Sequence, residues 1–398
     1  MSKFRFTSAD VKAMVRDIRG SSVMGNRVVN IYDLSDKTYL FKFAVPGQEK
    51  VFLLMESGIR FHTTKYTRDI PDLPAPFTMK LRKILKTRRM EDVRQIGDDR
   101  VIDFKFGSGD STNHVILELY ANGNIILTDK NYEVLSLWRS HQFADDVTLR
   151  VGEIYPIAFS TSAASVKQTL VQAITSELQS RDIKSDNKSK AELLRLWANL
   201  KLADSEVKAE IMNERVEQAK LQGGVGGRES RKQAKRANKK LTLRQLLFTP
   251  SSGISWVGPD ILDHCVLTAA ATTTHQGQGA KPTMKIDQLL ELRDDTLESL
   301  MTALSECERI MERIEILGQP GYIILQKPIS GSEGSESVDL NNSDRNENMS
   351  YAEYVPLLLS QHGDKEHREF ASFDEAVDEY YLRVEEQRLQ VQCYTSWC

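Results

Sequence analysis

Basic side chains that could neutralise phosphate groups are concentrated in two segments of this sequence. The first segment contains no acidic residue between positions 80 and 89. Its cations are Lys80, Arg82, Lys83, Lys86, Arg88 and Arg89. A helix is predicted from Phe77 to Arg89, and on it Arg82, Lys86 and Arg89 share one face while the aliphatic residues occupy another. Such a helix would rest on a core and present cations to a nucleic-acid backbone, although a solvated basic face is the plainer alternative.

The second basic segment follows a glycine-rich stretch at positions 223–227. Against the single acid Glu229, its cations are Arg228, Arg231, Lys232, Lys235, Arg236, Lys239 and Lys240. If these side chains contact RNA, binding should weaken steeply with salt, because each neutralised phosphate releases counterions. A nuclear localisation signal and a solvated linker are the alternatives.

Backbone groups offer a third way to bind phosphate. Gly258 and Pro259 are predicted to open a helix, whose first N–H groups and positive dipole end would be free for an anion. Helix-hairpin-helix modules bind nucleic-acid backbones in this manner. An ordinary helix start explains the same two residues equally well.

A tight turn is predicted at Gly97–Arg100, between two strands. There Asp99 and Arg100 stand side by side, and they could form a recognition fork or an internal ion pair. Taken alone, these residues favour a structural turn. Asp10 is predicted on the exposed side of the first turn of a helix, where it would compensate the helix dipole.

Signatures of enzymes are lacking. The sequence contains no Walker loop, no GxSxG and no HExxH motif, its seven histidines are scattered, and Cys265, Cys307, Cys393 and Cys398 form no CxxC pair. We therefore predict no catalytic residue, no metal site and no cofactor. No signal peptide or membrane span is expected, and the cysteine pattern fits a reducing compartment, which predicts a cytoplasmic or nuclear location.

The elements that must position these groups follow from hydrophobic spacing. A helix is predicted from Thr7 to Gly20, capped by Thr7 or Ser8. Alternating segments predict strands at 27–34, 37–43, 51–54, 59–63, 101–106, 114–120 and 124–129. Ala121, Asn122 and Gly123 indicate a hairpin. Helical spacing then dominates at 166–178 and 191–221, a long helix is predicted at 285–317 and a strand at 321–325, and a last helix begins at Phe373.

These elements predict a multidomain α+β protein. The expected domains are a strand-rich domain at 1–157, a helical module at 158–275 with a basic linker at 223–240, and a middle domain at 282–388. Residues 328–350 carry too few apolar groups to offset chain entropy, so a disordered insertion is predicted there, and residues 389–398 form an atypical tail. The net charge of −3 sums the basic and acidic segments of the chain, so it does not by itself indicate whether the protein binds nucleic acid.

Several segments in the same order resemble the NFACT family, in particular its eukaryotic members. They are KFRFTSADVKAMVRDIRG, RVVNIYDLSDKTYLFKF, LLMESGIRFHTTKY, VILELYANGNIILTD, LTLRQLLF with GPDILDHCVL, GYIILQK, and YVPLLLSQH with FASFDEAVDEYYLRVEEQ. The resemblance covers about residues 3 to 388. It implies a glycosylase-like N-terminal fold followed by a helix-hairpin-helix module and a middle domain leading into a coiled coil.

The resemblance implies a component of ribosome-associated quality control. Family members bind the large ribosomal subunit with a stalled peptidyl-tRNA and recruit tRNA for tailing of the nascent chain without mRNA, which supports its ubiquitination. By similarity, Asp10, Asp99 and Arg100 fall on residues associated with tRNA recruitment. The expected partners are large-subunit rRNA, tRNA and, through the family's coiled coil, a Listerin-type E3 ubiquitin ligase.

Two departures narrow this expectation. The related glycosylases attack with an N-terminal proline, whereas this sequence begins Met1-Ser2-Lys3, so neither DNA nor glycosylase chemistry is expected. The family's coiled coil and RNA-binding C-terminal half do not follow Gln387, so the tRNA-binding part is expected here without the ligase-binding part. A protein interaction scaffold or nuclear export adaptor that does not bind tRNA is the alternative.

Overall fold

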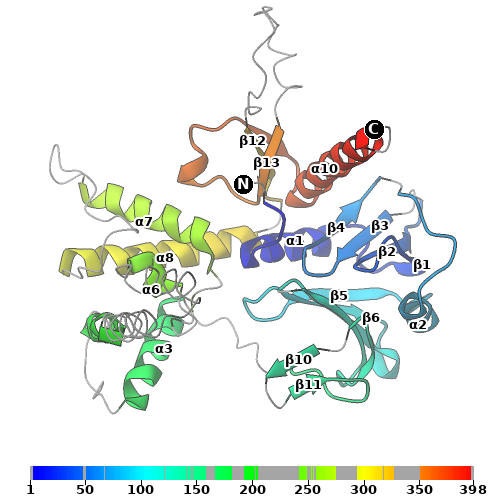
Figure 1. The fold of residues 1–398 in the computed structure, drawn as a ribbon, viewed down its shortest axis with the longest axis horizontal. Coiled ribbons are helices and arrows are strands. Elements are labelled where there is room, and N and C mark those ends of the chain that lie inside the picture. The colour runs from blue at the N-terminus through cyan, green and yellow to red at the C-terminus, as the bar shows by residue number, and fades with distance from the viewer. Residues whose placement is uncertain are drawn as a thin grey trace, which may run out of the picture. The chain divides into compact units, whose positions relative to one another are not determined.

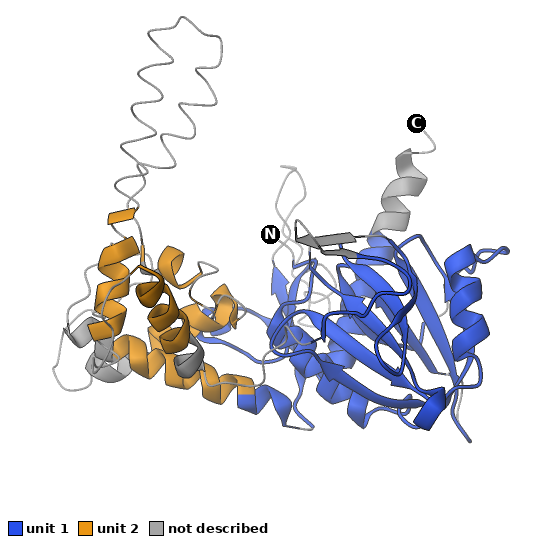
Figure 2. Cartoon of the chain, turned by 90° about the horizontal axis from the view of Figure 1, so that it is seen from below, with its two compact units in different colours: residues 1–163, 312–398 blue, residues 164–311 orange. Residues whose placement is uncertain are grey.

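The computed structural model divides the chain into two compact units (Figure 2). Unit 1 comprises Met1–Ala163 with Glu312–Cys398, and unit 2 comprises Ala164–Met311. The structure describes residues 3–47, 51–66, 68–120, 122–139, 141–144, 147–157, 166–181, 192–201, 203–204, 242–248, 252, 254, 257–274, 294–316, 318–326 and 350–395. The domain boundaries predicted at residues 157, 275 and 282 stay predictions. In the structure, the C-terminal segment Glu312–Cys398 belongs to the same unit as the N-terminal sheets.

Helix α1, Ser8–Gly20, opens unit 1 as its sequence predicts. Its N-cap is Thr7, whose hydroxyl accepts from the backbone of Asp10 while the Asp10 carboxylate accepts from the Thr7 backbone, which completes a capping box. The apolar face of the helix is buried through Val11, Met14 and Ile18. The predicted start, end and buried face of this helix are confirmed.

Two antiparallel sheets form the core of unit 1 (Figure 1). The first sheet has the order β1-β2-β3-β4, formed by Arg27–Asp33, Thr38–Ala44, Val51–Glu56 and Arg60–Thr64. The second has the order β5-β6-β7-β8-β9, formed by Met90–Gln95, Val101–Phe106, Asn113–Glu118, Asn124–Asp129 and Val134–Leu137. Aromatic pairs join their apolar faces, with ring centroids 6.1 Å apart for Phe41 and Phe106 and 5.5 Å for Phe61 and Phe104.

The predicted strands are confirmed, but β5, β9 and the small hairpin of β10, His141–Ala144, with β11, Val147–Leu149, were not predicted. Strand β5 cannot be predicted from hydrophobic spacing, because only two residues of its sequence, MEDVRQ, are buried: Met90 and Val93. A short edge strand of this kind is specified by its partner β6 rather than by its own pattern.

Helix α2, Pro76–Leu85, ends earlier than predicted. Lys86 already has a non-helical ψ of 134°, and Thr87 has a φ of +67° while its N–H donates to Val28. The chain must turn here to enter β5, and Arg89 bridges to Arg27 beside the first sheet. The prediction of a helix reaching Arg89, with Arg82, Lys86 and Arg89 on one helical face, is therefore wrong.

The backbones of the two sheets meet closely at one point. A Cβ atom added to Gly123, which has a φ of +70°, would lie 2.0 Å from the backbone nitrogen of Gly58. The Gly58 nitrogen donates to the carbonyl of Glu118 on β7. Only glycine fits at position 123, both because of its left-handed backbone and because of this contact. The predicted hairpin at Ala121, Asn122 and Gly123 is thereby confirmed, since β7 pairs with β8, although Ala121 itself lies outside the described residues.

The C-terminal part of unit 1 contains a third sheet and a helix. The sheet has the order β13-β12-β14, formed by Ser350–Val355, Gly321–Gln326 and His367–Phe370. The predicted strand at 321–325 is confirmed as β12, and the predicted helix start at Phe373 is confirmed as the start of α10, Phe373–Thr395. Of the predicted insertion at 328–350, all but Ser350 lies outside the described residues.

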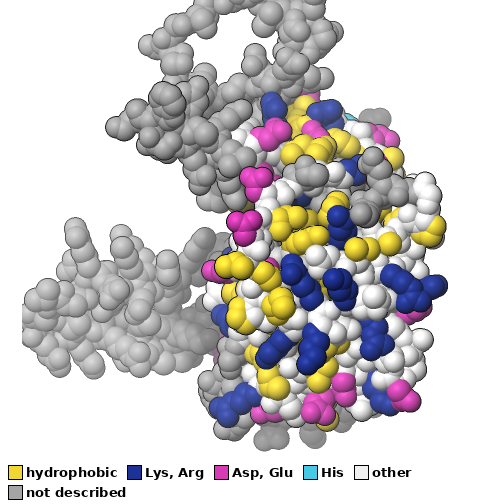
Figure 3. Space-filling view, turned by 90° about the vertical axis from the view of Figure 1, so that its right-hand side faces the viewer, with side chains coloured by type: hydrophobic (Ala, Val, Ile, Leu, Met, Phe, Trp, Pro, Cys, Tyr) yellow, Lys and Arg dark blue, Asp and Glu magenta, His cyan; other side chains and the backbone are white. Residues whose placement is uncertain are grey.

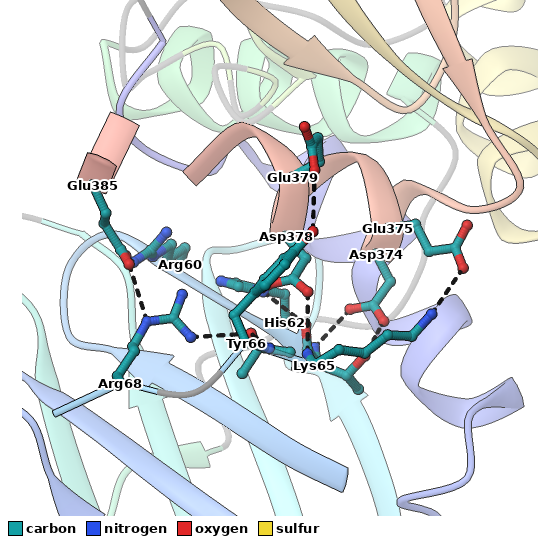
Figure 4. A network of polar contacts seen from close by, with 12 residues as sticks. Arg60, His62, Lys65, Tyr66, Arg68, Asp374, Glu375, Asp378, Glu379 and Glu385 are labelled. Atoms are coloured by element: carbon teal, nitrogen blue, oxygen red, sulfur yellow. Dashed lines mark hydrogen bonds and ion pairs between the residues drawn. The ribbon is translucent and has the colours of Figure 1, made fainter. Parts of the chain in front are cut away.

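Helix α10 lies along β4, the outer strand of the first sheet (Figure 4). The backbone N–H of Thr63 donates to Asp374 Oδ1 at 2.7 Å, and the N–H of Lys65 donates to Asp378 Oδ2 at 3.3 Å. Burial raises the pKa of Asp374 to about 7, an effect that the two bonds from Thr63 oppose. Asp374 and Asp378, one helical turn apart on α10, thus accept hydrogen bonds from backbone N–H groups along the outer edge of the first sheet.

Unit 2 is helical in its described part, with α3, Val166–Ser180, α6, Leu243–Leu247, and α7, Pro259–Thr274, followed by α8, Asp294–Glu315, which extends into unit 1. Helix α7 begins directly after Gly258, α8 falls within its predicted range, and α3 begins at the predicted residue but ends at Ser180 rather than at 178. The buried positions of α8 recur every three or four residues, as at Leu300, Leu304 and Cys307. The architecture is α+β with several antiparallel sheets, as predicted, while the glycosylase-like fold and the helix-hairpin-helix module stay predictions.

Candidate nucleic-acid interface

Exposed cations are gathered on and after helix α2. Lys80, Lys83, Lys86 and Arg89 are all exposed, and none of them forms an ion pair with another described residue. Figure 3, which views unit 1 from the α2 side, shows Lys and Arg side chains separated mainly by hydrophobic ones, with acidic side chains towards the rim. Unpaired cations on one surface create a local positive field that attracts phosphate groups.

Arg82 has a different role from its neighbours. Its Nε donates to the carbonyl of Ile31 at 2.6 Å, and its guanidinium lies 5.5 Å from the ring centroid of Tyr32. These contacts fasten α2 to β1. Contact between Arg82 and a phosphate group stays a prediction, and the geometry assigns this residue first to positioning the helix that carries Lys80 and Lys83.

The turn at Gly97–Arg100 lies between β5 and β6, as predicted, and begins with a φ of +58° at Gly97. Asp99 is exposed, and its Oδ1 accepts from the backbone N–H of Arg100 at 2.7 Å. The guanidinium of Arg100 forms no ion pair with any other residue that the structure describes. The internal ion pair between Asp99 and Arg100 is therefore absent, and the arginine keeps its donors for another acceptor.

Three residues that were not predicted attach this turn to α1. Ser8 Oγ donates to the carbonyl of Asp98 at 2.5 Å, and Gln95 Nε2 donates to the Ser8 carbonyl at 3.2 Å and to the Asp99 carbonyl at 2.8 Å. Lys12 Nζ lies 3.5 Å from Asp98 Oδ1. The sequence marks Ser8 only as a possible helix cap and carries no signal for Lys12 or Gln95, because α1 and the turn are far apart along the chain.

Lys12 also pairs with the end of helix α8. Its Nζ lies 2.5 Å from Glu315 Oε1. Burial raises the pKa of Asp98, and the nearby Lys12 opposes that rise. Lys12 therefore holds the turn in place, because Asp98 of the turn and Glu315 both pair with it. This contact fixes the orientation of the turn that carries Asp99 and Arg100.

Asp10 is buried, with a relative exposure of 0%, so its predicted place on the exposed side of the helix is wrong. Its carboxylate accepts from Lys3 Nζ at 2.8 Å, and from the backbone N–H and the hydroxyl of Thr7 at 2.7 Å each. Lys3 in turn donates to the carbonyl of Tyr354 at 3.0 Å. The reason for the burial is that the N-terminal segment passes over the helix start and brings its own cation to the carboxylate.

We expect Asp10→Ala to lower the free energy of unfolding by about 3 kcal/mol, because it removes an N-cap partner and leaves the charge of Lys3 without its carboxylate. Asp10→Asn should cost less, since one acceptor oxygen remains. Urea denaturation followed by circular dichroism measures both. Asp36→Ala, at an exposed turn, is the control. An Asp10→Ala variant within about 0.5 kcal/mol of the parent would contradict the buried role.

The remaining predicted phosphate sites belong to unit 2. The segment Arg228–Lys240, with Arg231, Lys232, Lys235, Arg236 and Lys239, lies outside the described residues. Gly258 has a φ of +85° and precedes the first turn of α7, which also contains the exposed acid Asp260. An acid in that turn competes with an anionic ligand for the helix dipole, so the geometry gives Gly258 no added support as a phosphate site.

Among the described residues, no cluster of three or more His, Cys, Asp or Glu side chains could hold a metal ion. None of the helices in the described part of the chain is both long enough and apolar enough to cross a bilayer.

Comparisons with known proteins connect this geometry to a family. Residues 7–220 match the NFACT N-terminal and middle domains. Ribosome quality control complex subunit NEMF of Homo sapiens is 31% identical over 391 residues, which cover 98% of this chain and 29% of the human protein. Ribosome quality control complex subunit 2 of Schizosaccharomyces pombe is 27% identical over 98% of this chain and 35% of its own length. The chain thus spans about a third of these relatives.

A solved structure, that of the fibrinogen binding protein from Staphylococcus aureus, covers 94% of this chain with a TM-score of 0.48 and 14% identity, and 98% of its own chain is covered.

Proposed function

Because this chain belongs to the NFACT family, matched through the NFACT N-terminal and middle domains, we propose that it acts in ribosome-associated quality control. In this role it binds the large ribosomal subunit that carries a stalled peptidyl-tRNA. It recruits tRNA there for extension of the nascent chain without mRNA, which supports ubiquitination and degradation of that chain. The names of its human and yeast relatives as ribosome quality control subunits support this proposal.

The observation that carries the proposal is the unpaired basic surface of unit 1. Lys80, Lys83, Lys86 and Arg89 are exposed, and no described carboxylate neutralises them. On a chain with a net charge of −3, such a surface is a local positive region that attracts a polyanion. The described cations would contact ribose-phosphate backbone, and the basic segment 228–240 would add further contacts.

Selectivity for tRNA is assigned to the turn beside α1. Asp99 and Arg100 are available at the surface, and their donors and acceptors suit ribose, phosphate and base edges. Asp10 acts through its neighbours, because it holds Lys3 and the start of α1, and the same helix holds the turn through Ser8. We therefore treat Asp10 as a positioning residue.

The test is binding of purified chain to tRNA and to large ribosomal subunits as a function of salt. Affinity should fall steeply between 50 and 200 mM salt, since phosphate contacts release counterions. A protein interaction scaffold or export adaptor would hold its partner through apolar contacts with little salt dependence. Crosslinking in the cytoplasm followed by RNA sequencing should recover tRNA and large-subunit rRNA. Absence of both RNAs, with salt-independent protein partners, would favour the scaffold.

Arg100→Ala should separate the two activities. We expect tRNA recruitment to a purified peptidyl-tRNA-bearing subunit to fall roughly tenfold, because a charge-assisted hydrogen bond is lost. Binding to the subunit itself should stay within about twofold, since phosphate contacts elsewhere supply that affinity. Lys130→Ala, which removes an exposed cation paired with Asp110, is the control. Equal loss of both activities in Arg100→Ala would count against the assigned role.

A further inference from the structure

Unit 1 contains a cavity of about 430 Å³ whose lining includes no residue of the basic surface and none of the Gly97–Arg100 turn. It lies among the N-terminal segment, the β1–β2 turn, strands β3 and β4, and α10. Its lining residues are Phe4, Arg5, Leu34, Ser35, Thr38, Leu54, Glu56, Ile59, Arg60, Arg68, Tyr381, Val384 and Glu385. The volume falls in the range of about 300–1,000 Å³ that is usual for small-molecule sites.

One wall of the cavity consists of two arginines held in fixed positions (Figure 4). Arg60 is 3% exposed, and it donates from Nε to Glu56 at 2.8 Å and from Nη2 to Glu385 Oε1 at 2.6 Å. Its guanidinium lies 3.6 Å from the ring centroid of Tyr381. Arg68 donates from Nε to the other oxygen of Glu385 at 3.0 Å. The two guanidinium groups are therefore brought together by a single carboxylate.

Each of these arginines keeps one nitrogen without an acceptor. Arg60 Nη1 and Arg68 Nη2 are buried, and neither has a hydrogen-bond partner among the described residues. A buried guanidinium donor without an acceptor is costly, and both of these donors belong to arginines that line the cavity, which favours a ligand with acceptor oxygens. Glu385 accepts from Nη2 of Arg60 and from Nε of Arg68, so it holds neither of these two unpaired nitrogens.

The charge and polarity of the lining indicate the kind of ligand. The lining contains two glutamates, Glu56 and Glu385, which already accept hydrogen bonds from Arg60 and Arg68, so the ligand is selected by the donors that these arginines have left. The lining also includes apolar residues, among them Phe4, Leu34 and Val384. A ligand that suits both the donors and the apolar residues has an anionic head with planar or tetrahedral oxygens and a short apolar body.

We propose that this cavity binds a small organic anion, a carboxylate or a phosphate monoester, whose oxygens contact Arg60 and Arg68 and whose apolar part packs on Phe4 and Leu34. The site is separate from the surface proposed to bind RNA. Its occupancy would also bear on α10, because the same arginines hold Glu385 of that helix.

The experiment is a calorimetric titration of the full chain, without RNA, with four probes of equal chain length: hexanoate, hexyl phosphate, hexylammonium and hexanol. We expect saturable binding of both anions at one site, at least about tenfold tighter than hexylammonium or hexanol, because charge-assisted bonds to arginine are available only to the anions. A preference for hexanoate or for hexyl phosphate identifies the head group.

Two variants locate the binding. Arg68→Gln removes one guanidinium and should weaken the binding of both anions about tenfold. Lys65 is an exposed cation on the same segment but outside the cavity lining, so Lys65→Gln should leave the affinity for both anions unchanged. Because Arg68 also holds Glu385, Leu34→Trp provides a second test that fills the cavity and leaves the arginines intact. It should abolish anion binding without changing the circular dichroism spectrum.

Three results would overturn the proposal. One is the absence of saturable binding of either anion to the unmodified chain, and another is equal affinity for hexanol, which would make the cavity merely apolar. The third is unchanged anion binding in a folded Leu34→Trp variant, which would place the anion elsewhere. Since no RNA is present, none of these results depends on the proposed role at the ribosome.

Discussion

Reversing the charge of Lys80, Lys83 and Lys86 together should weaken tRNA binding by roughly 10²–10³-fold at 0.1 M salt. The three lysines are exposed and unpaired among the described residues, and each phosphate contact contributes about 0.9 to the slope of log affinity against log salt on duplex nucleic acid. Losing three contacts therefore lowers that slope by about 2.7, which is a factor of roughly 500 at 0.1 M relative to 1 M. Fluorescence anisotropy with labelled tRNA, at several salt concentrations, measures both quantities.

The matched control reverses three other exposed cations of unit 1. Lys65, Lys365 and Arg383 each pair with a glutamate, and their replacement by glutamate changes the net charge of the chain by the same amount. If charge at a defined surface matters, this control should reduce affinity far less and should keep the salt slope. Equal losses in the two variants would mean that only the overall charge counts, and the α2 surface would lose its assignment.

The second large effect concerns stability. Gly123→Ala should lower the free energy of unfolding by about 2–5 kcal/mol, because alanine is strained at a φ of +70° and its Cβ would lie 2.0 Å from a backbone atom of Gly58. That contact joins the two sheets, and backbone on both sides leaves no flexible side chain to move aside. Thermal and urea denaturation of the purified variant give the change.

Gly25→Ala is the matched control for this substitution. Gly25 has nearly the same backbone, with a φ of +72°, but no atom lies within 4 Å of its added Cβ. It should therefore cost only the backbone strain, about 1–2 kcal/mol. If the two variants were equally destabilised, the close approach of Gly123 to Gly58 would contribute nothing.

Local features of the fold could be predicted from the sequence. Thr7 caps α1, Asn122 and Gly123 mark the hairpin, and Gly258 precedes α7, because each of these signals acts through its own neighbours in the chain. Strand β5 could not be predicted, since its pairing with β6 rather than its composition defines it. Nor could the end of α2, which is set by the bond from Thr87 to Val28.

The candidate sites divide in the same way. The unpaired lysines of α2 were visible as a segment without acids, and the turn carrying Asp99 and Arg100 was placed correctly between two strands. The burial of Asp10 was missed because its partner Lys3 comes from outside the helix. The arginine-lined cavity gave no signal at all, since Arg60 and Glu385 are 325 positions apart and only the folded chain brings them together.

The carboxylates of α10 have one more consequence, for association between chains. An outer strand with free N–H groups is a template on which another polypeptide can add a strand, which is a common route to aggregation. The N–H groups of Thr63 on β4 and of Lys65 directly after it are already bonded to Asp374 and Asp378. Helix α10 therefore protects this sheet edge from β-pairing with another chain. When the helix packs against the edge during folding, it covers a surface through which newly synthesised copies could otherwise associate.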